Sequence, residues 1–284
     1  MKYIICILLI VNIFSGTDLY VGYSGKNNNF NTIQEAVNKA ANLGPKDESS
    51  LVTIHIAPGT YRQQVMVEAP YITFVNDEPS KGEALLTWYY GIGYKYYSAS
   101  DKGVYNANLQ NTPCKQRWGA TVLLINKASY FKAKVITFEN SFNRYMTNEE
   151  IADGVEVLGD ANTSPINLQR NSGLDVKSKA ATERETALAA DCGYAKFLNC
   201  KFYSSQDTLY TGGSPLYFKN YLIEEQTDYI FGESNEVFDS CELRWKGYSS
   251  GSVGGYITTT RAGDGTYNGY LMYNCKLLKI NLLQ

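Results

Sequence analysis

Phe197-Leu-Asn-Cys-Lys-Phe202 and Phe218-Lys-Asn-Tyr-Leu-Ile223 are two copies of one pattern, in which an aromatic residue precedes Cys or Tyr and then an apolar residue. Phe238-Asp-Ser-Cys-Glu-Leu243 repeats it, and Met272-Tyr-Asn-Cys-Lys-Leu277 repeats it with Met in place of the aromatic residue. The first residues of the four copies are 21, 20 and 34 positions apart. A period of about 20 residues without helical periodicity is typical of one coil of a parallel β-helix. The longer interval fits a coil that carries an inserted loop.

The remaining sequence agrees with a solenoid. Val135-Ile-Thr-Phe-Glu-Asn140 resembles a further copy of the strand pattern, and short β-rich runs bounded by Gly, Asn, Asp and Ser occur at 52–56, 71–75, 121–125 and 135–138. One amphipathic helix is predicted, beginning after Thr32 and ending at Gly44, with Glu35 completing a capping box. Because the open end of a solenoid must be covered, we expect this helix to cap an all-β fold at its N-terminus.

Composition limits the class of protein. The chain has 284 residues, of which 44% are hydrophobic and 19% charged, so it folds as a globular domain. Its net charge of −2 provides no basic surface for nucleic acid. Residues 1–16 combine Lys2, a short apolar run and small residues, which is typical of a signal peptide. We therefore expect a secreted monomer with one domain over 17–284 and no membrane anchor after signal removal.

The chain has a single histidine, His55, which lies in an alternating apolar run. A multi-histidine metal centre is therefore excluded, and a Ser-His-Asp triad would have to use this one residue. We interpret His55 as a structural residue of a strand. If the protein is a hydrolase, carboxylates must carry out its acid–base chemistry.

Five cysteines follow the predicted signal peptide, and no pair has the C-x-x-C spacing of a metal site. The repeat places Cys200 and Cys241 two coils apart, roughly 9.6 Å, which exceeds disulfide reach. Cys241 and Cys275 are neighbours if the long interval loops outward. The other two are Cys114 and Cys192.

Two aspartates occupy equal places in the repeat. Asp207 follows Phe197 by ten residues, and Asp228 follows Phe218 by ten. Equal offsets stack the two carboxylates roughly 5 Å apart, where both cannot ionise cheaply, so one holds a proton while the other stays charged. This pair predicts an acid and a base, with the amide of Gln206 beside them; the alternative is a solvated aspartate ladder.

The same offset stacks Tyr210 on Phe231. Strand alternation counted from the aspartates turns these two rings away from the groove, so we expect them to pack in the core rather than to form a sugar platform. Tyr248 takes the equivalent place one coil later and is the better candidate for the groove.

These residues carry a resemblance to a known family. Gln206-Asp-Thr-Leu-Tyr210 and Thr227-Asp-Tyr-Ile-Phe-Gly232 are similar to the two central signatures of the pectin methylesterases. Thr32–Ala36, Pro58–Arg62, Ile136–Asn140 and Gly255–Thr259 extend the similarity over most of the chain. The resemblance implies a right-handed parallel β-helix that removes methyl esters from pectin.

The resemblance also implies roles for individual residues. Asp228 is expected as the nucleophile on the ester carbonyl, Asp207 as the acid that protonates methanol and then activates water, and Gln206 as an oxyanion donor. No metal or organic cofactor is expected. Arg184, Tyr248 and Tyr229 are the expected substrate-binding residues.

Three departures from the family pattern accompany the resemblance. Gln63 replaces a glutamate in Gly59-Thr-Tyr-Arg-Gln63, and Arg184 occupies the place of a second oxyanion glutamine. The family's Gly-Arg-Pro-Trp segment, whose arginine orients the nucleophile, does not occur, and Arg261 lies in a loop before the last copy of the repeat. On this basis the sequence predicts a shortened family member with reduced or absent esterase activity. The alternative is a non-catalytic, β-helical polysaccharide-binding protein or an inactive paralogue.

Overall fold

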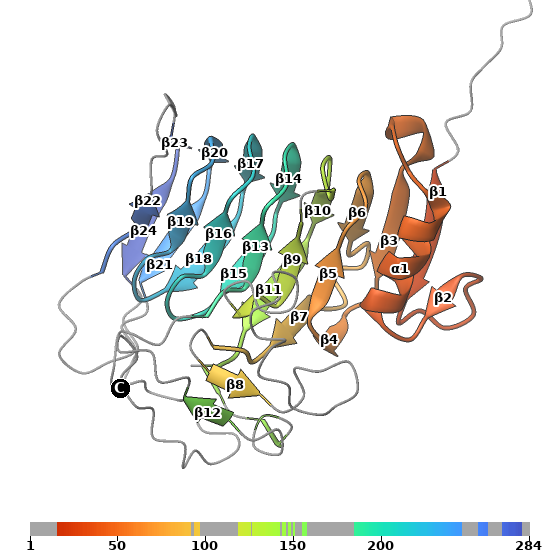
Figure 1. The fold of residues 1–284 in the computed structure, drawn as a ribbon, viewed down its shortest axis with the longest axis horizontal. Helices are drawn as coiled ribbons and strands as arrows, with labels where there is room; N and C mark the ends of the chain where they lie inside the picture. Colours follow the sequence, from red (N-terminus) through yellow and green to blue (C-terminus); the bar gives the residue numbers. More distant parts are fainter. Residues whose placement is uncertain are drawn as a thin grey trace, which may run out of the picture.

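The protein winds into a right-handed parallel β-helix, in which each coil contributes one strand to each of three parallel sheets (Figure 1). The computed structural model describes residues 16–91, 94–96, 119–125, 127–142, 144–145, 147–148, 150, 155–157, 185–245, 255–260 and 269–279. The predicted signal peptide therefore lies outside the described residues, apart from Gly16. No helix of the described ranges is both long and apolar enough to cross a bilayer.

Within the described residues, the largest sheet has nine strands, in the order β2 (Asn29–Phe30), β1 (Thr17–Val21), β3 (Val52–Ile56), β6 (Ile72–Val75), β10 (Lys132–Lys134), β14 (Ala195–Leu198), β17 (Leu216–Lys219), β20 (Glu236–Asp239) and β23 (Tyr270–Tyr273). The second has seven, in the order β24 (Lys276–Lys279), β21 (Glu242–Trp245), β18 (Leu222–Glu225), β15 (Lys201–Tyr203), β11 (Ile136–Asn140), β7 (Ala84–Trp88) and β4 (Gly59–Arg62).

The third sheet has six described strands, in the order β22 (Thr258–Thr260), β19 (Ile230–Gly232), β16 (Leu209–Thr211), β13 (Leu188–Ala190), β9 (Val122–Leu124) and β5 (Val65–Val67). Outside the coils, β8 (Tyr94–Tyr96) pairs antiparallel with β12 (Val155–Val157).

The sequence repeat and the coil coincide. Phe197 pairs with Phe218, Phe218 with Phe238, and Phe238 with Met272 in the nine-stranded sheet. The rings of Phe197 and Phe218 are stacked 4.8 Å apart and those of Phe218 and Phe238 5.0 Å apart. The period of about 20 residues is therefore confirmed, and so is the extra copy at 135–140, where β11 pairs with β15.

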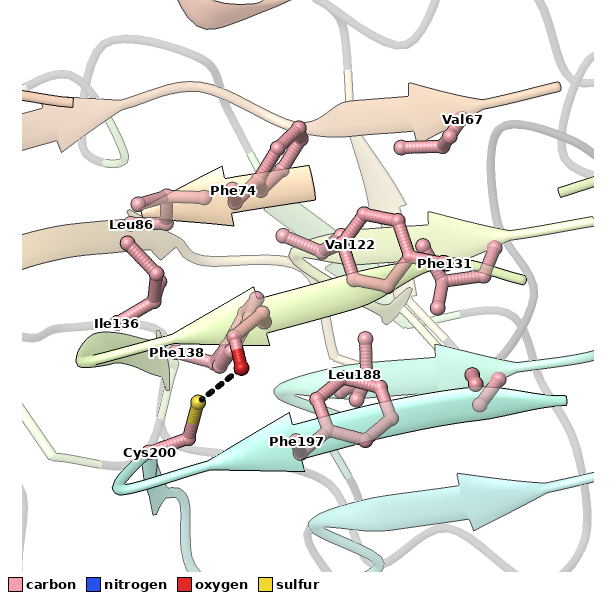
Figure 2. Packing of buried hydrophobic residues seen from close by; sticks show 14 of the residues in the cluster. Val67, Phe74, Leu86, Val122, Phe131, Ile136, Phe138, Leu188, Phe197 and Cys200 are labelled. Carbon is pink, nitrogen blue, oxygen red and sulfur yellow. Dashed lines mark hydrogen bonds between the residues drawn. The ribbon is translucent and has the colours of Figure 1, made fainter. Parts of the chain in front are cut away.

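The core fills the inside of the coils. Val122, Phe138, Leu188 and Phe197 come from all three sheets and point toward one another (Figure 2), and each is fully buried. Burying one such side chain contributes about 1.5–3 kcal/mol. Because every coil supplies these interior residues at the same places, the core continues along the solenoid axis.

The predicted helix is confirmed as α1 (Ile33–Leu43). Its N-cap Thr32 and Glu35 form the reciprocal capping box, and Gly44 ends it with φ 65°. Ile33, Ala36, Val37 and Ala40 are buried against the first coil. A short 3-10 helix, η1 (Glu48–Ser50), follows. In Figure 1, α1 lies across the N-terminal end of the coils, where an open core would otherwise meet water.

Corners between the sheets need left-handed backbone. Asn199, Asn220, Ser240 and Asn274 take φ values between 51° and 59° at the corners that follow β14, β17, β20 and β23. Asn adopts this conformation at lower cost than most side chains, which explains its recurrence in the sequence pattern. The amide of Asn220 also donates to Asn199 Oδ1 at 3.3 Å.

His55 lies on the outside of β3, as expected of a structural residue. Its Nε2 contacts Asp18 Oδ1 at 3.1 Å, its Nδ1 contacts Asp77 Oδ2, and its ring stacks on Tyr20 with 4.8 Å between centroids. These contacts tie the first coils together.

Three cysteines are stacked along the solenoid axis, at the corner between the nine-stranded and the seven-stranded sheets. Strand register places Cys200, Tyr221, Cys241 and Cys275 in four successive coils, so Cys200 and Cys241 are two coils apart and Cys241 and Cys275 are neighbours. All three of these cysteines are free. Cys275 Sγ donates to the Phe238 carbonyl at 3.3 Å, and Cys241 Sγ to the Asp239 carbonyl at 3.3 Å. Cys114 lies outside the described residues.

Candidate active site

The two aspartates lie at one corner, where the chain leaves the seven-stranded sheet and enters the six-stranded sheet. Leu209 pairs with Ile230, and an isolated bridge joins Gln206 to Thr227. Asp207 and Asp228 therefore occupy the same place in adjacent coils, as the equal offsets predict. Both have left-handed backbone, with φ of 61° for Asp207 and 56° for Asp228.

Donors hold the carboxylate of Asp228 on both oxygens. Gln206 Nε2 donates to Oδ2 at 3.2 Å, and Thr259 Oγ1 donates to Oδ1 at 2.5 Å. The Asp228 backbone N–H donates to the Tyr256 carbonyl at 2.6 Å. The side chain is half-buried, so the carboxylate is fixed and still meets solvent.

Asp207 is more enclosed than Asp228. Only 8% of Asp207 is exposed, and its carbonyl accepts from Thr186 Oγ1 at 2.9 Å. Because Thr186 lies in the preceding coil, this bond fixes the corner against the coil on its other side.

A buried glutamate lies behind the pair. Glu225, at the end of β18, is fully buried, and neither of its carboxyl oxygens has a hydrogen-bond partner within the described structure. Burial raises the pKa of Glu225 well above its ordinary value, and the neighbouring Asp207, Glu185 and Asp228 raise it further, while Thr208 opposes the shift. Burial inside the coil therefore favours the neutral form of Glu225.

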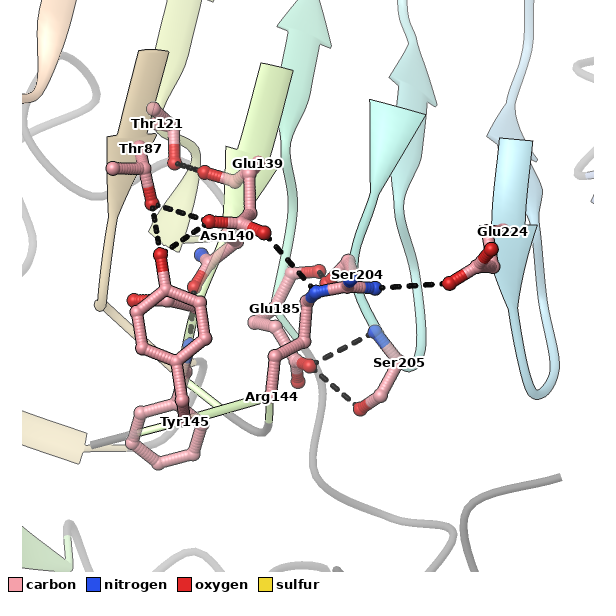
Figure 3. Close-up of polar contacts among 12 residues, drawn as sticks. Thr87, Thr121, Glu139, Asn140, Arg144, Tyr145, Glu185, Ser204, Ser205 and Glu224 are labelled. Carbon is pink, nitrogen blue, oxygen red and sulfur yellow. Dashed lines mark hydrogen bonds and ion pairs between the residues drawn. The ribbon is translucent and has the colours of Figure 1, made fainter. Parts of the chain in front are cut away.

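Glu185 supports the same corner from the preceding coil. Its Oε1 accepts from Ser205 N at 3.0 Å and Ser205 Oγ at 2.6 Å, and its carbonyl accepts from Ser204 Oγ at 2.7 Å (Figure 3). These bonds fix the backbone immediately before Gln206 and Asp207.

A second polar network covers the outer face of the seven-stranded sheet. Arg144 forms ion pairs with Glu139 at 3.2 Å and Glu224 at 3.5 Å, and all three side chains are largely buried (Figure 3). The hydroxyls of Tyr145 and Thr87 donate to Glu139 Oε1 at 2.5 and 2.9 Å. Burial and Glu139 raise the pKa of Tyr145. The network holds the segment that follows β11 against the sheet.

The expected place of Tyr210 and Phe231 is wrong. Leu209 and Ile230 occupy the core instead, whereas Tyr210 and Phe231 lie half-buried on the outer face with ring centroids 5.1 Å apart. The left-handed aspartates interrupt the strand, so alternation cannot be counted through them. Tyr210 packs outside the coil against Leu123 and Ala189.

Tyr229 lies inside the coil, because the register shifts at the same corner. It is 4% exposed, and its hydroxyl donates to the Glu225 carbonyl at 3.1 Å. Burial raises its pKa. Tyr229 therefore belongs to the core, and its role in substrate binding stays a prediction. The other two expected substrate-binding residues, Arg184 and Tyr248, lie outside the described residues, as does Arg261.

Sequence reasoning missed Thr259, Glu185 and Glu225. A signal for Glu225 existed, because alternation in β18 from buried Ile223 places residue 225 on the same inner side. The repeat gave no signal for Thr259, because it follows Asp228 by 31 residues, outside the 20-residue period; the family-like segment Gly255–Thr259 pointed to the stretch but not to this residue. Within the described ranges, no group of three or more His, Cys, Asp or Glu side chains is arranged to hold a metal ion.

The fold and the corner define a class: a β-helical protein with two stacked aspartates and a glutamine amide at its surface, an arrangement suited to acyl transfer. Comparison with known proteins identifies the family. The family model for Pectinesterase matches residues 102–283, which is more than half of the chain. The chain belongs to the pectinesterase family.

Relatives and solved structures agree with that assignment. Pectinesterase QRT1 of Arabidopsis thaliana is 23% identical over 244 residues, which cover 85% of this chain and 51% of the relative. Probable pectinesterase A of Neosartorya fischeri is 38% identical over 95 residues, 32% of this chain and 26% of the relative. This chain thus spans about half the length of the first of these relatives and a quarter of the second.

Two solved structures share the fold. Pectin methylesterase from carrot has a TM-score of 0.63 at 20% identity, covering 93% of this chain and 64% of that one. The rice weevil pectin methyl esterase has a TM-score of 0.65 at 21% identity, covering 94% of this chain and 66% of that one. At these identities the likeness establishes the right-handed parallel β-helix.

Proposed function

We propose that the protein is a carboxylic ester hydrolase that removes methyl esters from pectin and releases methanol. One observation carries the proposal: Asp207 and Asp228 stand side by side in adjacent coils, with Gln206 Nε2 on Asp228 Oδ2. Stacked carboxylates divide into one that keeps its proton and one that is charged, which supplies a base and an acid from one residue type. Membership of the pectinesterase family supports the methyl ester of pectin as the substrate.

The environments of the aspartates support a division of roles. Asp228 is half-buried and held by donors on both oxygens, as an ionised nucleophile that meets substrate must be. Asp207 is enclosed, and an enclosed carboxyl beside a second carboxylate favours its protonated form. We assign Asp228 as the nucleophile and Asp207 as the general acid.

The reaction follows in two steps. Asp228 attacks the ester carbonyl carbon, Asp207 protonates the departing methoxide, and methanol leaves an acyl-enzyme. Asp207, now charged, takes a proton from water; the resulting hydroxide attacks the acyl carbon, and Asp228 departs as carboxylate. The Gln206 amide has a second N–H, which donates to the oxyanion that forms in each step.

The polymer and the compartment are part of the proposal. Pectin methylesterase has been solved in complex with hexasaccharide VII, and at 18% identity it shares the present fold with a TM-score of 0.65. The half-buried rings of Tyr210 and Phe231 lie on the same outer face as Thr259. The signal-like residues 1–16 support action outside the cell.

The test is methanol release from methyl-esterified polygalacturonate by the purified chain. The wild-type protein is expected to release methanol, at the reduced rate that the departures from the family pattern predict, and Asp228→Asn to release none. Asp239→Asn is the matched control, since Asp239 is an aspartate at the end of β20, bonded to Lys219 and Tyr217 and remote from the pair in register. Polymer binding without methanol release would contradict the proposal and favour a non-catalytic polysaccharide-binding protein.

A further inference from the structure

Thr259 lies in β22, one coil beyond Asp228. Strand register pairs Thr259 with Phe231, so its side chain is on the outer face of the six-stranded sheet, whereas Thr258 pairs with the core residue Ile230. The exposed Thr259 hydroxyl donates to Asp228 Oδ1 at 2.5 Å, the shorter of the two side-chain bonds to that carboxylate. Nothing else in the described structure bonds to this hydroxyl.

We infer that Thr259 is a positioning residue with two effects. It orients the Asp228 carboxylate so that one oxygen attacks the substrate and the other does not, and it stabilises this carboxylate when it leaves the acyl-enzyme. The inference rests on the proposed function. Oδ1 is held by the hydroxyl, while Oδ2 carries the longer bond from Gln206. Oδ2 is therefore the atom that attacks, and Oδ1 becomes the carbonyl oxygen of the mixed anhydride.

The hydroxyl acts differently in the two steps. When Oδ2 bonds to the ester carbon, negative charge leaves Asp228, and the bond from Thr259 to Oδ1 weakens. When water attacks the acyl carbon, its proton goes to Asp207, the bond from that carbon to Oδ2 breaks, and the charge returns to Asp228. A hydrogen bond to a charged acceptor is about twice as strong as one to a neutral acceptor. The hydroxyl therefore favours deacylation over acylation.

The rest of the corner holds the backbone of Asp228. The Asp228 N–H donates to the Tyr256 carbonyl, and the Tyr256 N–H donates to Thr227 Oγ1 at 3.0 Å. These bonds join the segment just before β22 to the preceding coil independently of residue 259. Losing the Thr259 hydroxyl is therefore expected to free the carboxylate without releasing the strand.

The experiment compares Thr259→Val, which keeps shape and removes the donor, with Thr259→Ser, which restores a hydroxyl. Thr258→Val is the matched control, because it makes the same change on the core side of the same strand. Methanol release gives kcat and kcat/KM, and acid quenching during turnover followed by mass spectrometry measures the acylated fraction of the protein.

For Thr259→Val we expect kcat to fall about 10- to 100-fold, the range for one hydrogen bond to a charged group. The kcat/KM value should change less than about threefold and acyl-enzyme should accumulate; both other variants should resemble the wild type. Equal falls in kcat and kcat/KM, or an unchanged Thr259→Val, would overturn the inference. A wild-type chain that releases no methanol would instead overturn the proposed function.

Crystal structures of the same variants provide a readout that does not depend on turnover. In Thr259→Val the Asp228 carboxylate is expected to rotate away from its wild-type orientation, and in Thr258→Val to keep it. An unrotated carboxylate in Thr259→Val would show that the hydroxyl does not position it.

Discussion

Asp207 and Asp228 share a residue type, a left-handed backbone and a place in the coil, yet their surroundings differ. Asp207 is enclosed and lies beside the coil that supplies Glu185 and Thr186. Asp228 is half-buried and receives donors from Gln206 and Thr259. The backbone repeat therefore places two identical groups, and the side chains of the coils on either side give them different exposure and different hydrogen-bond donors.

The comparison also shows how a solenoid makes a site. A repeated corner multiplies one geometry along the axis, so every coil can present a residue at the same place. Chemistry then requires a break in the repetition. Here the break has three parts: Thr259 in the coil after Asp228, Glu185 in the coil before Asp207, and the buried Glu225 in the coil of Asp228 itself.

The largest effect is expected for Asp228→Asn. An amide is not a nucleophile toward an ester, so methanol release should fall roughly 10⁴-fold or more, as removal of a nucleophile does in other hydrolases. The loss should be the same for esters of any alcohol. Residual activity above that of buffer, measured with methyl and trifluoroethyl esters of oligogalacturonate, would mean that the nucleophile is misassigned.

Asp207→Asn is expected to differ from Asp228→Asn in how strongly its activity depends on the leaving group. Loss of a general acid costs about 10²–10⁴-fold when the leaving group needs a proton. Trifluoroethoxide needs it far less than methoxide, so release of trifluoroethanol in the first turnover should be largely restored in Asp207→Asn and not in Asp228→Asn. If both variants lose both substrates equally, the two aspartates do not have distinct roles.

Gln206→Ala removes the amide between the two coils. Loss of one oxyanion donor costs about 10²–10³-fold in kcat, and the KM value should change little because the oxyanion exists only in the transition state. Gln226→Ala is the control, because it removes the amide of a buried glutamine that adjoins Thr227, the residue paired with Gln206 in the next coil. A defect confined to KM would assign Gln206 to substrate binding.

The smallest effect concerns stability and uses a buried acid away from the pair. Burial raises the pKa of Glu236 from its ordinary 4.5 to about 8, while Ser234 and Thr211 oppose the shift. The folded protein therefore keeps a proton that the unfolded chain releases, and stability falls as pH rises from 4.5 toward 8.

Glu236→Gln removes this penalty. Its free energy of unfolding should exceed that of the wild type at pH 8 by on the order of 2–4 kcal/mol and equal it near pH 4. Urea unfolding at the two pH values measures the difference. Equal stability at pH 8, or a gain that is the same at both pH values, would show that burial does not raise the pKa of Glu236 in the folded protein.

Much of the fold was predictable because each coil of a β-helix has interior residues at the same places, so the length of a coil appears as a repeat in the sequence. The aromatic residue of each copy is an interior position, so the spacing of Phe197, Phe218 and Phe238 is also the length of a coil. The stacking of the aspartates followed from the same spacing. The helix was predictable from purely local signals, the box of Thr32 and Glu35 and the stop at Gly44.

The rest depended on features that spacing does not carry. Tyr210 and Phe231 were misplaced because one left-handed residue reverses the side on which the next strand begins. Tyr229 entered the core for the same reason. Thr259 belongs to a coil that is longer than the 20-residue repeat. The repeat predicts that this coil pairs with the preceding one, but it does not predict which of its residues lies beside Asp228.

The most direct test of the central claim is to identify the acylated residue. Acid quenching during turnover on a methyl-esterified oligogalacturonate, followed by digestion and mass spectrometry, locates the bound acyl group. We predict that the mass of the sugar acid appears on the peptide containing Asp228 and on no peptide containing Asp207, with more of it in Thr259→Val. An adduct on Asp207, or continued methanol release with no adduct in any of these proteins, would contradict the assignment of Asp228 as the nucleophile.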